Sequence, residues 1–384
     1  MDLAKLKICF LAGTLGQGGA ERQLFYNLKA LRECGADARL LCLGQHEFWE
    51  DPIRRLGIPI IYVGRSKSKL KRLFRIVAEL HRDRPAIFQS QHFYTSAYVG
   101  AAARLLRIPG IGALRNDGSS EVRDAGHLGG WLGLRVPEVM VANSQSAIRH
   151  ATEHGVRPER VHFLLNVVDT DHFRPGSRSR EETVRLIGVG RLREVKRFDR
   201  FLSTLARLRR EGNRPVTGMI VGVGPLSAQL EKQAQTLGLL PGAVEFKGRI
   251  ADVAPIYREA DICVLTSDHE GTPNVALEAM SCGLPVVATK VGGVSAIIND
   301  GENGFTVEPG DNAALYAALV PLIDDPHFRI RMGARARAFV ETNHTVTLLP
   351  EKLSELYRSV LSTPQPLNCA PAALNREGFA AKRL

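Results

Sequence analysis

The 384-residue chain has few aromatic residues and no long apolar run, and each absence excludes a class of protein. Phe, Trp and Tyr make up 6% of the residues. They are not interleaved with Arg as in a base-stacking platform, so nucleic acid is the least favoured partner. No apolar stretch approaches the ~18 residues that span a bilayer. The run over residues 8–12 is too short for the apolar region of a signal peptide, so we expect no export signal.

Cysteine is also scarce. The six cysteines are scattered along the chain, and no two form a C-x-x-C pair. This spacing argues against a zinc knuckle and against a disulfide framework, and it is typical of a reducing compartment. We therefore expect a cytoplasmic protein.

Positive charge is in excess, with a formal net charge of +11. Residues 1–175 hold 25 Lys and Arg against 17 Asp and Glu, which predicts an anionic partner such as a phosphorylated substrate or an acidic membrane surface. Six cations fall in the run that starts at Arg65 and ends at Arg75, and Leu70 and Phe74 give this run amphipathic helical spacing. We predict peripheral attachment to the inner face of an anionic membrane; the alternative is a solvated helix face.

Short apolar runs rich in β-branched residues alternate with helical patterns along the chain, which predicts parallel strands buried on both faces. The runs are residues 6–12, 38–43, 58–63, 86–90, 110–114, 139–142 and 161–165, then 184–189, 218–223, 244–247, 262–266, 285–289 and 304–307. A segment of linker composition, residues 174–182, separates the two groups. The pattern predicts an α/β protein of two doubly wound domains facing a central cleft, with ligands bound by the loops that follow the strands.

The domain boundaries follow from this pattern. We expect an N-terminal domain over residues 1–174 and a C-terminal domain over residues 183–345. A last helical pattern, residues 346–361, is expected to pack back on the N-terminal domain. Residues 362–384 are rich in Pro, Ala and Asn without periodicity, so we expect a mobile tail.

The segment over residues 266–283 has the strongest chemical pattern. A strand leads into a loop and then a helix over residues 273–282, for which Thr272 is the expected N-cap and Pro273 the first helical residue. The start of such a helix attracts an anion. Glu270 precedes the helix, and Glu278 lies within it among apolar residues. A carboxylate there needs a partner, which the vicinal hydroxyls of a sugar could supply; a loop carboxylate and a salt-bridged helix residue are the alternatives.

The setting Ser-Asp-x-Glu-Gly-x-Pro-Asn-x-x-x-Glu-Ala-Met around Glu270 and Glu278 resembles the donor-site signature of the retaining glycosyltransferases of family 4, which have the GT-B fold. The Gly-Gly-Ala-Glu-Arg run at residues 18–22 resembles members that act in polysaccharide or lipid-linked glycan biosynthesis. Further stretches match in the same order and extend the resemblance from residue 6 to about residue 361. They are residues 143–144, 166–175, 189–196, 221–225, 246–248, 292–293 and 300–304.

The resemblance implies two Rossmann-like domains, the first binding an acceptor and the second a nucleotide sugar. It implies transfer of a hexose from a UDP- or GDP-sugar to a glycan or a lipid-linked saccharide, with retention and with neither a metal nor another cofactor. Arg191 and Lys196 match the residues that hold the diphosphate. Glu278 matches the ribose-binding carboxylate, and Glu270 matches a position beside the sugar ring.

Other candidates lie on loops that follow predicted strands. Arg249 and Ile250 are expected to contact the base. Sugar hydroxyls or the β-phosphate are expected to contact backbone groups of Gly271, Thr272, Pro273 and Asn274. Two further sets of glycines could lie against phosphate or acceptor: Gly16, Gly18 and Gly19, then Gly222 and Gly224. The first set lacks the G-K-[ST] ending of a P-loop, and Ser227 stands where a dinucleotide fingerprint needs its last glycine. A tight strand–helix turn is the alternative for the first set.

The resemblance also implies a His near the sugar in the first domain. His92 is our candidate catalytic residue and His127 the second choice, with a structural role as the alternative for both. After the strand at residues 110–114, where many relatives carry His, this chain has Arg115-Asn116-Asp117. This departure argues against a mechanism that needs that imidazole and points to an anionic acceptor. A second departure is Ala296, where Glu is usual.

Two other functions fit the same fold. One is a nucleotide-sugar-modifying enzyme such as an epimerase, or a phosphorylase. The other is a catalytically dead protein that binds nucleotide sugars. The Glu-x7-Glu setting disfavours the epimerase, and no cofactor-lysine context supports the phosphorylase. The joint presence of Arg191, Lys196, Glu270 and Glu278 argues against loss of activity.

Overall fold

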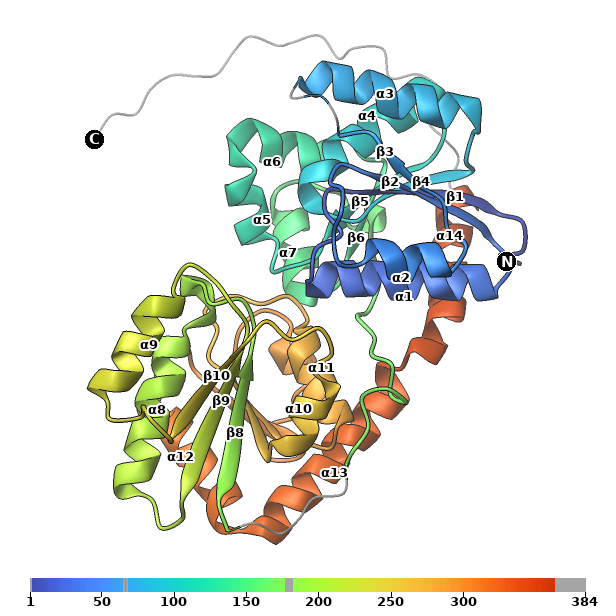
Figure 1. Ribbon diagram of the computed structural model, residues 1–384. Helices are drawn as coiled ribbons and strands as arrows, with labels where there is room; N and C mark the ends of the chain where they lie inside the picture. Colours follow the sequence, from blue (N-terminus) through green and yellow to red (C-terminus); the bar gives the residue numbers. More distant parts are fainter. Residues whose placement is uncertain (1, 65, 67, 177–181, 363–384) are drawn as a thin grey trace.

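The computed structural model describes residues 2–64, 66, 68–176 and 182–362. Figure 1 shows two domains, each built on a sheet with helices beside it. Within the described residues the first sheet has seven parallel strands in the order β3-β2-β1-β4-β5-β6-β7, and the second has six in the order β10-β9-β8-β11-β12-β13. The strand order reverses between β1 and β4 and between β8 and β11, as in doubly wound sheets. The predicted fold class of two Rossmann-like domains is confirmed.

The strands coincide with the predicted apolar runs to within one or two residues at most ends. The first sheet contains β1 (Lys7–Ala12), β2 (Asp37–Cys42), β3 (Ile60–Tyr62), β4 (Ile87–Ser90), β5 (Gly110–Leu114), β6 (Val139–Ala142) and β7 (Val161–Phe163). The second contains β8 (Val184–Val189), β9 (Val216–Val221), β10 (Val244–Gly248), β11 (Ile262–Leu265), β12 (Val286–Thr289) and β13 (Gly304–Val307). Most central strand residues are buried, so helices cover both faces of each sheet, as the continuous apolar runs indicated.

Helices fill the segments between the strands. The first domain contains α1 (Gly19–Glu33), α2 (Glu50–Arg55), α3 (Lys69–Arg82), α4 (Ser96–Leu106), α5 (Ser119–Asp124), α6 (Gly126–Arg135) and α7 (Gln145–Glu153). The second contains α8 (Phe198–Glu211), α9 (Ser227–Thr236), α10 (Ala254–Glu259), α11 (Asn274–Ser281), α12 (Asn312–Asp324) and α13 (Pro326–Asn343), and α14 (Leu349–Ser362) follows.

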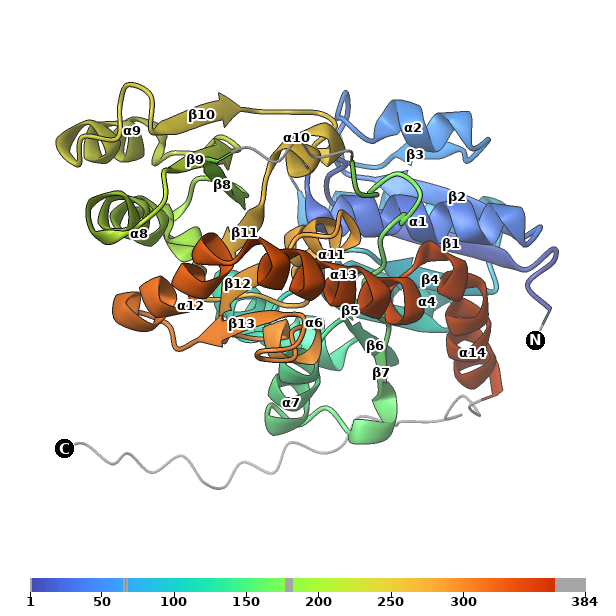
Figure 2. The same ribbon diagram turned by 90° about the horizontal axis from the view of Figure 1, so that it is seen from below.

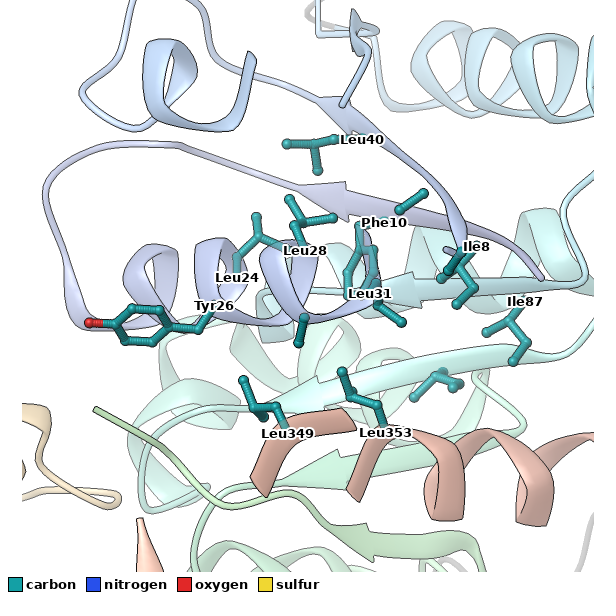
Figure 3. Close-up of a cluster of buried hydrophobic side chains, with 14 of the residues drawn as sticks. Ile8, Phe10, Leu24, Tyr26, Leu28, Leu31, Leu40, Ile87, Leu349 and Leu353 are labelled. Atoms are coloured by element: carbon teal, nitrogen blue, oxygen red, sulfur yellow. The ribbon is translucent and has the colours of Figure 1, made fainter. Parts of the chain in front are cut away.

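The last helix returns to the first domain. Figure 2 shows α12, α13 and α14 running in succession from the second domain to the first. Leu349 and Leu353 of α14 belong to the same buried cluster as Leu28 and Leu31 of α1, and Figure 3 shows Leu349 and Leu353 pointing toward α1. The hydroxyl of Tyr357 donates to Gln89 Oε1 on β4 at 2.8 Å. The chain therefore crosses twice between the domains.

The loops after the strands of the two sheets meet at one interface. Asn166, which follows β7, donates through Nδ2 to the Thr272 carbonyl oxygen at 2.8 Å. Asp117, which follows β5, lies 3.0 Å from His269 Nδ1 on the loop after β11. The carboxyl ends of both sheets thus face each other, which is where doubly wound sheets bind ligands.

Parts of three predictions lie outside the described residues. These are Arg65 and Lys67 of the basic run, residues 177–181 of the linker, and residues 363–384 of the tail.

Candidate functional site

The loop between β11 and α11 is held by groups of the other domain. Pro273 has an extended backbone, with φ −74° and ψ 115°, so the helix begins at Asn274 and the prediction of Pro273 as first helical residue was wrong. Thr272 was also wrongly predicted as the N-cap, because its hydroxyl donates to the Asn143 carbonyl oxygen at 2.5 Å instead. The helix ends in a glycine cap: Gly283 has φ +73°, and the Leu284 amide donates to the Ala279 carbonyl oxygen at 3.0 Å.

Glu270 and Lys196 form an ion pair between the loops that follow β11 and β8. Lys196 Nζ lies 2.5 Å from Glu270 Oε1, and the Ser267 hydroxyl donates to the same oxygen at 2.7 Å. The side chain of Lys196 is 26% exposed and that of Glu270 is 10% exposed. The Thr266 hydroxyl holds this loop by donating to the Lys196 carbonyl oxygen at 3.0 Å. The Lys196 ammonium is therefore only partly accessible to water and lies next to a carboxylate.

Arg191 follows β8 and is exposed. In the part of the chain that the structure describes, its guanidinium has no ion-pair partner. It faces the first domain closely, because a Cβ placed on Gly18 would lie 3.2 Å from Arg191 Nη2. A cation in this position can receive an anion that enters between the domains.

The two sets of glycines allow close backbone contact. A side chain at Gly222, which has φ +139°, would overlap the Gly190 carbonyl oxygen, and one at Gly224 would overlap that of Leu192. These glycines therefore pack against the loop that carries Arg191. In the first domain, a Cβ on Gly18 would overlap Glu21 and one on Gly19 would overlap Asn274 Nδ2. A Cβ on Gly16 would lie 3.3 Å from Thr14 Oγ1.

His92 follows β4 and has both ring nitrogens engaged. The Gly13 amide donates to Nδ1 at 3.2 Å, and Nε2 lies 3.1 Å from Glu21 Oε1. Because Nδ1 accepts, the proton belongs on Nε2, which donates to the carboxylate. His92 thus links the β1 loop to α1, and His127, the second choice, is exposed on α6. Glu21 was not predicted to be a site residue, although it lies in the Gly-Gly-Ala-Glu-Arg run.

Glu278 lies inside α11 with a side chain only 6% exposed. Its Oε1 pairs with Arg22 Nη1 of α1, and its Oε2 accepts from the Tyr257 hydroxyl at 3.1 Å. Burial, together with the Glu278 charge, raises the pKa of Tyr257, which keeps the phenol protonated and able to donate. The guanidinium of Arg22 also lies 5.5 Å from the centre of the Phe173 ring. The carboxylate expected to bind ribose is therefore paired across the domain interface.

The remaining nucleotide-side candidates lie along the same interface. The Ile250 carbonyl oxygen accepts from Gln17 Nε2 at 2.5 Å, and Arg249 is exposed beside it. Asn274 Oδ1 accepts from Gln23 Nε2 at 2.9 Å. Gly271 is buried, and its carbonyl oxygen accepts from the Gly293 amide at 2.9 Å. Gln17, Arg22 and Gln23 were not predicted to contact the second domain.

Sequence reasoning also missed the contact between Asp117 and His269. Burial raises the pKa of Asp117, but hydrogen bonds from Ser120 and Ser119 outweigh it and hold the pKa below its usual value. An ionised Asp117 therefore faces the His269 ring. Asp117 belongs to the Arg-Asn-Asp departure, so the substituted segment contacts the Glu270 loop directly.

The site gathers Arg191, Lys196, the Gly18–Gly19 turn and the Glu270 loop at the carboxyl ends of two facing sheets. This arrangement can hold a polyanion beside hydrogen-bonding carboxylates. Across residues 2–64, 66, 68–176 and 182–362, no group of three or more His, Cys, Asp or Glu could bind a metal ion. No helix in those ranges has the length and apolarity needed to cross a membrane.

Comparison with known proteins identifies the family. The model for Glycosyltransferase Family 4 matches residues 17–172, and the model for Glycosyl transferases group 1 matches residues 183–325. D-inositol 3-phosphate glycosyltransferase of Frankia alni is 33% identical over 277 residues, which cover 64% of this chain and 67% of that protein. The chain therefore belongs to glycosyltransferase family 4.

Other curated relatives match over shorter stretches. D-inositol 3-phosphate glycosyltransferase of Geodermatophilus obscurus is 34% identical over 223 residues, which cover 52% of this chain and 48% of that protein. N-acetyl-alpha-D-glucosaminyl L-malate synthase of Bacillus anthracis is 27% identical over 240 residues, which cover 60% and 62%. The matched region thus spans about half to three fifths of the length of these relatives.

Solved structures show the same fold at lower identity. The HepE protein of Anabaena, crystallised with UDP and glucose, has a TM-score of 0.80 and 22% identity, and the match covers 92% of this chain and all of that one. A glycosyltransferase of Rickettsia africae has a TM-score of 0.78 and 18% identity, covering 94% and 100%. These matches support the GT-B arrangement of the two domains.

Proposed function

We propose that this protein is a retaining glycosyltransferase that moves a hexose from a UDP- or GDP-sugar onto a glycan or a lipid-linked saccharide. The observation that carries the proposal is the Lys196–Glu270 pair, with Arg191 on the same loop as Lys196, at the carboxyl ends of two facing sheets. Two cations and an adjacent carboxylate suit a diphosphate joined to a sugar.

In the proposed reaction, the bond between the sugar C1 and the β-phosphate oxygen breaks and the acceptor oxygen bonds to C1 on the same face. The electron pair of the broken bond goes to the diphosphate, and the acceptor proton leaves with it. Arg191 and Lys196 neutralise the growing negative charge, so no metal ion is needed in this proposal. Glu270, held by Lys196 and Ser267, orients the sugar through its hydroxyls.

The relatives support the substrate classes. HepE of Anabaena was crystallised with UDP-glucose, which supports a UDP-sugar donor. Several curated relatives are named for inositol 3-phosphate, which supports an acceptor that carries negative charge. The basic first half of this chain is consistent with such an acceptor.

We also propose that α3 attaches the enzyme to the cytoplasmic face of an anionic membrane. Leu70 is 69% exposed and Phe74 is 73% exposed, and the two lie one turn apart on the same face of the helix. Lys69, Lys71 and Arg75 flank them. Exposed apolar side chains among cations are typical of helices that lie in a membrane interface.

Thermal-shift measurement tests the donor class. We expect UDP or GDP, and the matching nucleotide sugar, to raise the melting temperature, because a ligand that binds only the folded state stabilises it. NAD⁺ is the matched control and should leave the melting temperature unchanged. A protein stabilised by no nucleoside diphosphate would contradict the proposal.

Incubation with a sugar-labelled donor and a membrane lipid extract then tests transfer. Label in the lipid fraction supports a transferase. Conversion of the donor to another free nucleotide sugar would favour the epimerase-like alternative, and binding without turnover would favour the dead binding protein.

A further inference from the structure

Two side chains of the first domain bind groups of the second domain that are expected to bind the nucleoside. The first is Gln17, whose Nε2 donates to the Ile250 carbonyl oxygen at 2.5 Å. Ile250 lies in the loop after β10, where the base is expected. A base N–H that donates to this oxygen would compete with Gln17 directly.

The second is Arg22, which pairs with Glu278 Oε1. The side chain of Arg22 is 16% exposed and that of Glu278 is 6% exposed. The Tyr257 hydroxyl takes the other carboxylate oxygen. A ribose hydroxyl that donates to Glu278 would therefore compete with Arg22 for Oε1.

Both side chains come from one short segment at the start of α1. Gly18 and Gly19 lie between them, and a Cβ on Gly19 would overlap Asn274. Because these two positions have no side chain, the segment can pack closely against α11. Because the segment belongs to the first domain and Ile250 and Glu278 to the second, both contacts can be released by one movement of the domains apart.

We propose that Gln17 and Arg22 form an autoinhibitory contact that closes the nucleoside site in the ligand-free protein, and that the nucleotide displaces both side chains on binding. The inference rests on the proposed function. The apparent affinity for the nucleotide is lowered by the fraction of molecules in which the site is closed. The contact also favours ligands with an intact diol, because only these replace the lost partner of a buried carboxylate.

Titration calorimetry with UDP and with GDP tests the proposal on the full-length chain. Two variants change the contact: Gln17→Ala, and Arg22→Met, which removes the charge and keeps an unbranched side chain near Phe173. Arg32→Met, on the exposed far end of α1, is the control. We expect Arg22→Met to lower the dissociation constant of the preferred nucleotide about tenfold, the low end for close charge pairs. Gln17→Ala should lower it a few-fold, and Arg32→Met should not change it.

Unchanged or weaker binding in both site variants would overturn the contact. If Arg22→Met does not fold, as its circular dichroism spectrum would show, Gln17→Ala alone decides, because it removes one half-buried side chain from a loop. If the wild-type protein binds a nucleotide and neither variant binds it more tightly, only the autoinhibitory contact is rejected. A wild-type protein that binds neither UDP nor GDP rejects the proposed function and the contact with it.

Discussion

Lys196 and Glu270 lie 74 positions apart in the sequence, and their Nζ and Oε1 atoms are 2.5 Å apart where β8 and β11 end. The pair places a cation at a fixed position beside the proposed sugar and diphosphate. Each side chain gives the other a partner of opposite charge in a position that is only partly accessible to water. The two side chains therefore act as one unit.

Replacement of Lys196 by Met should lower kcat for transfer by about 10²- to 10³-fold, because one donor to the departing diphosphate is removed. Arg193→Met, on an exposed neighbour in the same loop, is the matched control and should retain wild-type kcat. Because Glu270 acts with Lys196, the double variant with Glu270→Gln should lose less than the product of the single losses. Steady-state kinetics of the two single variants, the double variant and the control measure these losses, and a double loss equal to the product of the single losses would show that the pair does not act as a unit.

Replacement of His92 by Gln should lower kcat by less than about tenfold, whereas loss of a general base costs about 10²- to 10⁴-fold. Both ring nitrogens are already engaged within the protein, since Nδ1 accepts from the Gly13 amide and Nε2 lies 3.1 Å from Glu21 Oε1. Gln can make one bond of each kind. The measurement is kcat at saturating donor, with His127→Gln as control, and a loss above 100-fold with intact fold would make His92 a catalytic residue.

Glu121 should make the protein less stable as the pH rises. Burial raises the pKa of its carboxyl to about 7, against the opposing amides of Arg115 and Asn116. The folded state therefore keeps a proton that the unfolded state releases near its ordinary pKa of 4.5. Stability is full below that value and falls by about 1–3 kcal/mol as the pH rises to about 7.

Urea unfolding at pH 5 and pH 7.5 measures this loss. Glu121→Gln should remove most of it, because Gln remains neutral and keeps an acceptor for the two amides. Glu231→Gln, on the exposed surface of α9, is the control and should keep the wild-type dependence. Equal pH dependence in the wild type and in Glu121→Gln would reject this role.

Membrane attachment should depend on the apolar side chains of α3 as well as on its cations. Phe74→Ser should weaken binding to phosphatidylglycerol vesicles about tenfold, because burial of such a side chain is worth about 1.5–3 kcal/mol. Ile330→Ser, an exposed apolar residue on α13, should have no effect. Sedimentation at low and high salt measures binding, and equal binding to phosphatidylcholine vesicles would count against the proposal.

The strands could be predicted from the sequence because both faces of each sheet are buried. Each central strand then appears as a continuous β-branched run, and such runs are recognisable without knowing their neighbours. β9 differs: it begins at Val216 and ends at Val221, two residues before the predicted end. Gly222 leaves the strand with φ +139° to approach Gly190, and this contact is not visible in the local pattern.

The site was only partly predictable for the same reason. The loops that carry Arg191, Lys196 and Glu270 follow strands, so their meeting at one edge could be inferred. The pairing of Glu278 with Arg22 joins residues 256 positions apart in different domains. Likewise, Thr272 has the composition of a cap, but its hydroxyl is used by Asn143 of the other domain. Propensity describes what a residue can do locally, and the interface decides what it does.

A crystal structure of the protein with an unhydrolysed nucleotide sugar is the sharpest test of the proposed donor site. Our prediction is that the β-phosphate lies within hydrogen-bond distance of Arg191 and Lys196, the ribose on Glu278 and the hexose beside Glu270. Density for the nucleotide away from these four side chains would contradict it.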